Sequence, residues 1–285
     1  MFTFIFPVIT LLFYVESKSL LDDIWTPWSL QSFKTIHVFL KLAIPGIFMN
    51  CAEWWAYEIA VFISGSFGVD ALAAMTLMMN VWIVIYMVPL GISIAATTRV
   101  GNAVGSGNIS LAKRNTFAAV ILTVISQGIM IVLLYVTRNY WPLLFTNNEK
   151  VLAYLREIIP VVCLFLLPDG LQVTLGGILR SVGKVISAAT TNIFANYFIG
   201  LPVGIFLAFH CELNIKGEWI GLACSSYTIT FFLAIICFFL PWDKIIENAK
   251  NLMATINTVQ PIESTDVSIE LSVFEAPKSD TKEKC

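Results

Sequence analysis

Long runs of apolar residues dominate the chain, and short polar segments separate them. A helix that rises about 1.5 Å per residue needs about 20 such residues to cross the hydrocarbon core of a bilayer. The apolar residues do not alternate with polar ones, as the strands of a β-barrel would require. The pattern therefore predicts an all-α membrane protein, a six-helix transmembrane bundle built from residues 40–67, 72–96, 111–136, 151–178, 186–209 and 220–240.

The segments around these runs predict four parts. Residues 1–15 are apolar but too short for a full span, and they lack the basic start of a signal peptide, so we predict a truncated transmembrane helix. Residues 16–39 are polar and contain tryptophans, which suits an interfacial linker lying on the membrane. The six-helix transmembrane lobe takes residues 40–242, and the polar residues 243–285 predict a disordered cytoplasmic tail.

The composition agrees with a lipid environment. Apolar residues make up 58% of the chain and charged residues 13%, whereas a soluble domain carries about 25% charged residues. The mean hydropathy is +0.81. The net charge is −2 and no basic cluster precedes the tail, which argues against a nucleic-acid partner.

The sequence contains no pattern typical of an enzyme. The six cysteines form no CxxC pair, and His37 and His210 are far apart, so neither a metal site nor a cofactor is predicted. A phosphate-binding Walker pattern is absent, and no histidine lies near a serine or cysteine at a plausible spacing. We therefore expect no catalytic residues.

Basic residues predict the orientation, because cytoplasmic loops are enriched in Lys and Arg. If the first linker is cytoplasmic, most basic residues lie on that side, and the C-terminus is cytoplasmic as well. We expect a multi-pass protein of the plasma membrane. The cytoplasmic basic residues would include Lys18, Lys34, Lys41, Arg99, Lys113, Arg114, Arg180 and Lys184.

Three carboxylic acids lie inside predicted spans and away from the span ends: Glu53, Glu58 and Asp169. A charge at the centre of a span costs about 2.5–3.5 kcal/mol on insertion scales. No Lys or Arg inside these spans neutralises the acids, so they would carry a proton or wait for an external cation, as in a proton-coupled carrier of cations. The alternative is a protonated acid that is hydrogen-bonded between helices. Glu53 and Glu58 point about 140° apart on a helix, and the sequence does not decide which of them faces a cavity.

Neighbouring residues extend this candidate site. Pro168 precedes Asp169, and a broken helix can line an ion-binding cavity, although a simple kink is the alternative. Trp54 and Tyr57 lie near the acids, and aromatic faces bind organic cations, although packing in the core or at the interface explains them equally well. Asn80 is a neutral polar residue for which an interhelical hydrogen bond is the default role.

Several motifs, in order along the chain, resemble the multidrug and toxic compound extrusion (MATE) family, and its eukaryotic organic-cation/proton antiporters in particular. The resemblance implies two lobes of six helices that exchange an organic cation for a proton, or in some relatives for sodium. It matches Glu53 and Glu58 to acidic positions of the seventh helix and Asp169 to a glutamate of the tenth. Asn80 stands where the animal members have a glutamate. The motifs are the residues 51–58, 86–89, 99–107, 176–180 and 200–204.

The resemblance covers only the C-terminal lobe, because the chain begins in what resembles the sixth helix. We therefore expect that the chain alone does not complete a transport cycle and needs a missing N-terminal lobe or a partner chain. The alternative is a non-transporting membrane module, or a truncated isoform that associates with a full-length transporter. A flippase of lipid-linked saccharides is a third possibility, but the spans offer no cationic residue away from their ends for its phosphates.

Overall fold

The computed structural model describes residues 2–17, 36–247, 249 and 251. Every element in this part of the chain is a helix, so the predicted all-α class is confirmed. The chain divides into two units, residues 1–51 and 52–285. Most of the predicted linker 16–39 and most of the tail lie outside the described residues.

The first unit holds α1 (Phe2–Ser17) and the first part of α2 (Ile36–Ser64). Helix α1 contains Pro7, and its described side chains are exposed and largely apolar. The two helices take residues 16–17 and 36–39 from the predicted linker, because helical structure extends beyond the most apolar residues at each side.

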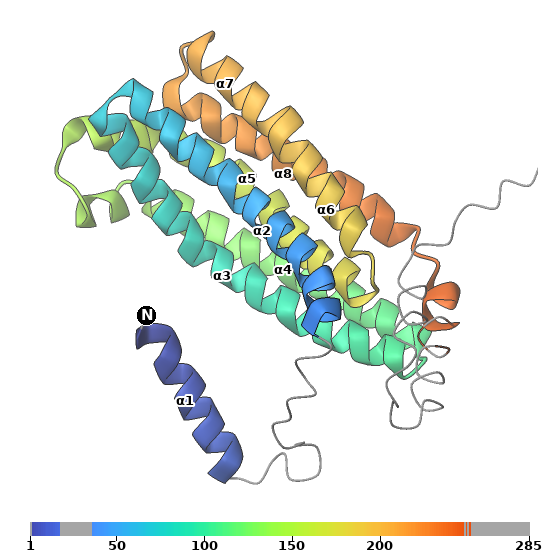
Figure 1. The fold of residues 1–285 in the computed structure, drawn as a ribbon. Helices are drawn as coiled ribbons and strands as arrows, with labels where there is room; N and C mark the ends of the chain where they lie inside the picture. The colour runs from blue at the N-terminus through green and yellow to red at the C-terminus, as the bar shows by residue number, and fades with distance from the viewer. Residues whose placement is uncertain (1, 18–35, 248, 250, 252–285) are drawn as a thin grey trace, which may run out of the picture. The chain divides into compact units, whose positions relative to one another are not determined.

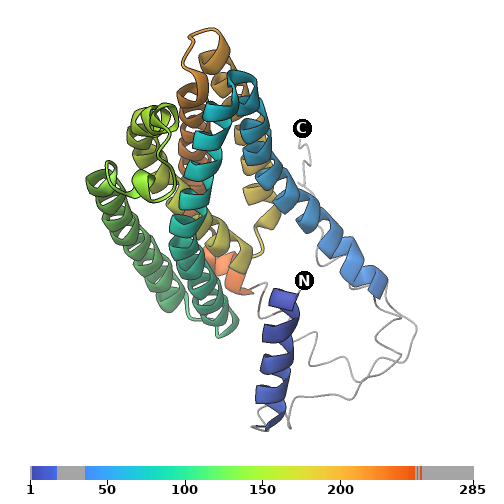
Figure 2. The ribbon, with the colours of Figure 1, turned by 90° about the vertical axis from the view of Figure 1, so that its left-hand side faces the viewer.

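The second unit contains the end of α2 and the remaining helices, which run side by side as an elongated bundle (Figures 1 and 2). Five candidate spans, all at least 25 residues long, were found in the described residues, and the segment Val185–Phe209 counts as one of them. A π-helix, η4, lies within that segment, and short 3-10 helices, η2 and η3, lie in two of the connections. The elements are η2 (Gly65–Phe67), α3 (Val69–Gly105), α4 (Ile109–Thr137), η3 (Trp141–Leu144), α5 (Glu149–Ser181), α6 (Val185–Phe194), η4 (Ala195–Gly200), α7 (Leu201–Phe209) and α8 (Asn214–Phe238).

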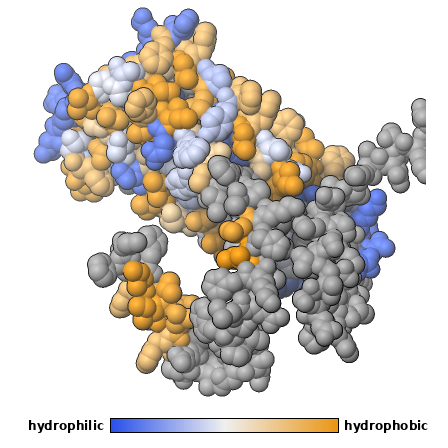
Figure 3. Space-filling model, in the orientation of Figure 1, coloured by the Kyte–Doolittle hydropathy of each residue, from blue (hydrophilic) through white to orange (hydrophobic). Residues whose placement is uncertain are grey.

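The surface of the bundle is suited to lipid. Figure 3 shows apolar residues along much of the visible face, with the strongly hydrophilic residues mainly towards its ends. Large apolar residues are exposed along the length of α4 and in the second half of α8, from Tyr227 onward. An apolar exterior of this kind is stable only where hydrocarbon covers it.

Short connections are fixed by hydrogen bonds at the helix ends. Gly107 has φ +73°, a value that a residue with a side chain rarely adopts, and Asn108 then donates its backbone N–H to Ala103. The Asn108 side chain next accepts from the backbone N–H of Leu111 at 2.9 Å and begins α4. One short segment thus ends α3 and begins α4.

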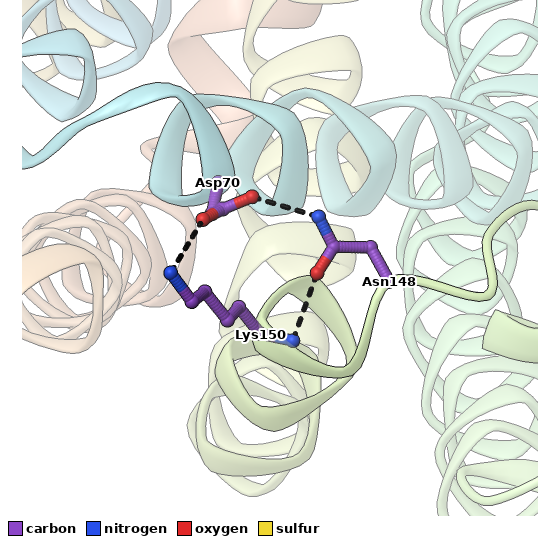
Figure 4. A network of polar contacts seen from close by, with 3 residues as sticks. All are labelled: Asp70, Asn148 and Lys150. Atoms are coloured by element: carbon purple, nitrogen blue, oxygen red, sulfur yellow. Dashed lines mark hydrogen bonds and ion pairs between the residues drawn. The ribbon is translucent and has the colours of Figure 1, made fainter.

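A polar contact joins the starts of α3 and α5 (Figure 4). The Asn148 amide donates to Asp70 Oδ1 at 2.8 Å, and Lys150 Nζ lies 4.0 Å from Asp70 Oδ2. Asn148 also accepts the backbone N–H of Lys150 and begins α5. These residues are largely exposed, so the contact orients the loop and contributes little to stability.

Helix α5 lies at the centre of the bundle, where it contacts α3, α4 and α8. Pro168 has no backbone N–H, so the carbonyl of Leu164, four residues earlier, lacks its usual donor. The Tyr227 hydroxyl of α8 donates to that carbonyl at 3.2 Å, and Thr230 donates to the Pro168 carbonyl at 2.7 Å. Helix α5 is nevertheless continuous from Glu149 to Ser181, so the broken helix considered from the sequence is not found, and α8 supplies the donor that Pro168 lacks.

Small residues bring other helices close together. A Cβ on Gly177 of α5 would lie 2.2 Å from Ser93 Oγ of α3. Ser93 and Thr97 use this closeness to donate to the carbonyls of Val173 and Gly177. In lipid the hydrophobic effect does not drive helices together, so close packing of small residues and interhelical hydrogen bonds usually join them.

Helices α7 and α8 approach each other backbone to backbone, and we expect Gly221→Val to separate them. A Cβ on Gly221 would lie 2.5 Å from the Gly200 carbonyl oxygen and from Gly204 Cα. Overpacking of a tight contact costs about 1–3 kcal/mol. The variant should therefore unfold at a clearly lower temperature in detergent. The control is Gly128→Ala on α4, where a Cβ meets nothing within 4 Å, and the melting temperature should not fall.

The described part of the tail differs from the prediction. Residues 242–247 are helical, and Trp242 and Ile246 are buried against the cluster that contains Val100 and Leu179. The disordered tail predicted from residue 243 was therefore wrong for these residues, because two apolar side chains among charged neighbours suffice to dock one helical turn.

Candidate acidic site in the bundle

Asp169 follows Pro168 within the continuous helix α5 and lies in the interior of the bundle. Its side chain is 1% exposed. Trp82 of α3 donates its indole N–H to Asp169 Oδ2 at 2.9 Å, and Gln172 donates to Oδ1 at 3.0 Å. Both donors are neutral, and the described residues contain no ion pair to Asp169. The carboxyl group is therefore held in place without a fixed positive partner.

Aromatic rings surround this carboxyl group. Trp82 is at their centre: its ring centroid lies 4.7 Å from that of Tyr57, 5.4 Å from that of Tyr86 and 6.2 Å from that of Trp54. The phenol of Tyr57 lies within electrostatic range of Asp169. The acid therefore lies behind electron-rich rings, which attract cations through their faces.

Glu53 of α2 faces the same interior and is half-buried. Asp169, Tyr57 and Tyr86 all lie in the electrostatic field of its carboxyl group. Its side chain is paired with Asn192 of α6, which in turn accepts from Asn196 at 2.6 Å. Asn192 thus connects the acids with the segment that contains the π-helix.

A positive side chain lies near one acid. Arg180, at the end of α5, is exposed and acts electrostatically on Glu53. It lies 11 residues after Asp169, which corresponds to about 16 Å along a helix, so it does not pair with that acid. The positive charge is therefore confined to one end of the site.

Glu58 and Asn80 lie on a different surface from Glu53 and Asp169. Glu58 is exposed and lines a wide, open hollow of about 880 Å³ with Trp55, Phe62 and Leu72. Asn80 is also exposed, and its amide donates to the Thr76 carbonyl of its own helix at 2.9 Å. Because Leu72, Thr76 and Asn80 are spaced by four residues, Asn80 continues the helix face that starts at the hollow.

The structure thus brings together Glu53, Asp169, Trp54 and Tyr57 and places Glu58 and Asn80 elsewhere. Trp82, Tyr86, Gln172 and Asn192 join the interior group, although sequence reasoning did not single them out as site residues. Their spacing held a signal, since Trp82 and Tyr86, and likewise Asp169 and Gln172, lie one helical turn apart.

A further buried acid, Glu218, was missed altogether. It lies in the first part of α8, which begins at Asn214, six residues before the apolar run predicted from residue 220. Its side chain is 3% exposed. The lysine and glutamate before Trp219 made this segment look like a loop, because polar residues usually mark the end of a span.

Membrane-length apolar helices around interior acids define a multi-pass integral membrane protein. The model of the MatE family matches residues 45–206, more than half of the chain. The chain belongs to the MatE family, and the resemblance seen in the sequence is confirmed.

Individual relatives agree with this assignment. The chain is 37% identical over 243 residues to multidrug and toxin extrusion protein 1 of Mus musculus, a match that covers 85% of this chain and 43% of the relative. It is 36% identical to human multidrug and toxin extrusion protein 2, over 84% of this chain and 40% of the relative. The chain thus spans less than half the length of these curated relatives.

A solved structure shares the fold. The crystal structure of the eukaryotic MATE transporter AtDTX14 superposes with a TM-score of 0.79 at 27% identity, over 86% of this chain and 55% of that one. The described helices therefore correspond to about half of a MATE transporter fold.

Proposed function

We propose that this chain forms one lobe of a secondary antiporter that exports organic cations or other xenobiotics in exchange for protons. Asp169 carries the proposal: it is 1% exposed, and its oxygens accept from the neutral donors Trp82 and Gln172. Burying an unpaired charge is costly, so the carboxylate needs a proton or a cationic guest at any time. If a proton and a cation can neutralise the carboxylate only one at a time, binding of one releases the other.

Glu53 would be the first of the two acids that a cation meets when it enters the site. It is half-buried, whereas Asp169 is fully buried, and the two acids interact electrostatically. A cation drawn to Glu53 would lower the cost of removing the proton from its neighbour. The rings of Trp54, Tyr57 and Trp82 would hold the apolar body of an organic cation beside these acids.

Glu58 and Asn80 would act on the exposed face of α2 and α3. An open hollow of about 880 Å³ beside Glu58, lined largely by apolar side chains, is large enough for an organic cation. We propose that this face lines the substrate path once a second lobe, from a longer chain or a partner, covers it. Asn80 has no carboxylate, so this position can neither bind an exchangeable proton nor attract a cation by charge.

The basic residues support a cytoplasmic C-terminus. Arg99, Lys113 and Arg114 flank the connection of α3 and α4, while Arg180 and Lys184 flank that of α5 and α6, at the same end of the bundle (Figure 1). An excess of Lys and Arg is typical of the cytoplasmic side. We propose the plasma membrane as the location, because that is where cation export removes a compound from the cell.

A chimera tests the proposed function. Residues 45–242 would replace the aligned segment of the Mus musculus relative, and proteoliposomes with an imposed pH gradient would be loaded with a fluorescent organic cation. We expect release of the cation that depends on the gradient and is coupled to counterflow of protons, recorded with a pH-sensitive dye. Release without proton movement, or none from a chimera that is folded and inserted, would contradict the proposal.

The wide opening of the hollow beside Glu58 favours a second candidate, a membrane module that does not transport by itself. Such a module would associate with a full-length transporter and change its rate. Co-purification of the chain with the full-length relative, together with an absence of cation binding to the chain, would favour this alternative.

A further inference from the structure

A carboxyl group lies outside the acidic site, where the ends of α2, α7 and α8 meet. Glu218 of α8 is 3% exposed, and neither of its carboxyl oxygens has a hydrogen-bond partner among the described residues. A small hollow of about 10 Å³ lies beside it. A hollow of this size holds about one water-sized particle.

Tight packing fixes the position of this carboxyl group. A Cβ on Gly217 would lie 2.5 Å from the backbone nitrogen of Ala208, and a Cβ on Gly221 would lie 2.5 Å from the Gly200 oxygen. Glu218 is held between these two contacts, and a Cβ on Gly204 would already lie 3.4 Å from its Cα. Helix α8 therefore cannot turn the side chain towards the outside without separating from α7.

The hollow beside Glu218 is otherwise lined by uncharged residues. The elements packed against it are α2, the η4–α7 segment and its own helix, and no titratable or charged residue of their described parts lines the hollow. The other lining residues are aliphatic or glycine: Ala60, Ile63, Gly200, Leu201, Gly204, Ile205 and Leu222. An ionised Glu218 would thus face hydrocarbon, which is strongly unfavourable for a bare carboxylate.

The size and chemistry of the hollow select the occupant. An organic cation does not fit into about 10 Å³. A metal cation requires several oxygen ligands, and the side chains here supply only the carboxyl oxygens of Glu218. A proton needs neither space nor further ligands.

We propose that Glu218 is a second proton-binding site, separate from Glu53 and Asp169, whose proton keeps α2 packed against α7 and α8. Loss of the proton places a charge in the hollow, admits water and loosens α2 from the tightly joined α7–α8 pair. Glu53 lies on the same helix, ten residues before Ile63. The proton on Glu218 thereby influences the helix that carries an acid of the main site, without any contact between the two acids.

Infrared spectroscopy of the whole chain in lipid nanodiscs tests the proposal without a transport assay. The chain would carry E53Q and D169N, so that a C=O stretching band of a buried, protonated carboxyl group at neutral pH reports Glu218. We expect this band to be present, to be lost in E218Q, and to persist in the control E212Q, which changes an exposed glutamate of the adjacent loop. The proposal would be overturned if the band is absent from the chain that carries E53Q and D169N with native Glu218. It would also be overturned if the band persists after E218Q is added.

Thermal unfolding of the same chain in detergent gives a second measurement. If the folded state keeps the proton that the unfolded state releases, the unfolded state binds fewer protons and stability falls as the pH rises. We expect the melting temperature to fall with pH, and this slope to be smaller in E218Q and in E218M, which fills the hollow without a charge. Equal slopes in all three chains would overturn the proposal; if E218Q does not fold, E218M decides.

Discussion

Asp169→Asn should reduce pH-driven exchange by the chimera at least about tenfold, the factor that 1.4 kcal/mol corresponds to. An amide has nearly the shape of the carboxyl group but can neither bind the exchanged proton nor attract a cation. The variant is expected to fold, because its oxygen can still accept from Trp82. The Gln172 oxygen has no partner among the described residues, so a flipped Gln172 amide can accept from the new NH₂ group.

The assay would record release of the fluorescent cation after a pH jump, with equal amounts of folded protein in each sample. Glu157→Gln is the matched control, since it neutralises an exposed acid of the same helix. Exchange by the D169N chimera at the unsubstituted rate would remove Asp169 from the mechanism, while Glu53→Gln would show whether the second acid is needed as well.

Vesicles that contain only this chain should show no pH-driven accumulation of an organic cation above protein-free vesicles. The chain covers 43% of its Mus musculus relative, and the hollow beside Glu58 is open on the side away from α2 and α3. A site that opens widely cannot alternate between two sides of a membrane. We expect binding of the cation to persist, whereas its coupled movement requires a surface that closes the path.

The complementary experiment supplies a second lobe that can close the hollow beside Glu58. The N-terminal lobe of the relative would be co-expressed with this chain as a separate polypeptide and reconstituted with it. Restored exchange would show that the chain is a competent lobe. Robust proton-driven exchange by the chain alone would refute the expectation and point to self-association, in which a second copy closes the hollow.

The helices were largely predictable because each span must be a long apolar run, and the runs from 72 to 240 coincide closely with the helices found. Ends defined by polarity were less reliable. Helix α8 starts six residues before the predicted run and thereby buries Glu218. The π-helix Ala195–Gly200 could not be predicted either, because its apolar composition fits a regular helix equally well.

The acids were predictable from the sequence, but which residues group around them was not. Unpaired acids in apolar runs are costly, which singled out Glu53, Glu58 and Asp169. Helix periodicity gives the angle between Glu53 and Glu58 but not which neighbouring helix each one meets. That depends on contacts such as the indole of Trp82 reaching Asp169, 87 residues away in the sequence. The functional role of each of these residues remains a prediction.

Pro168 within α5 has a consequence for the way the lobe can move. The carbonyls of Leu164 and Pro168 accept from Tyr227 and Thr230, two hydroxyls from one face of α8. If α5 slid against α8, the Leu164 carbonyl would be left without a donor in a medium that offers no replacement. Helices α5 and α8 are therefore expected to move together as one rigid unit. Any rocking of the lobe must then move other helices relative to α5 and α8.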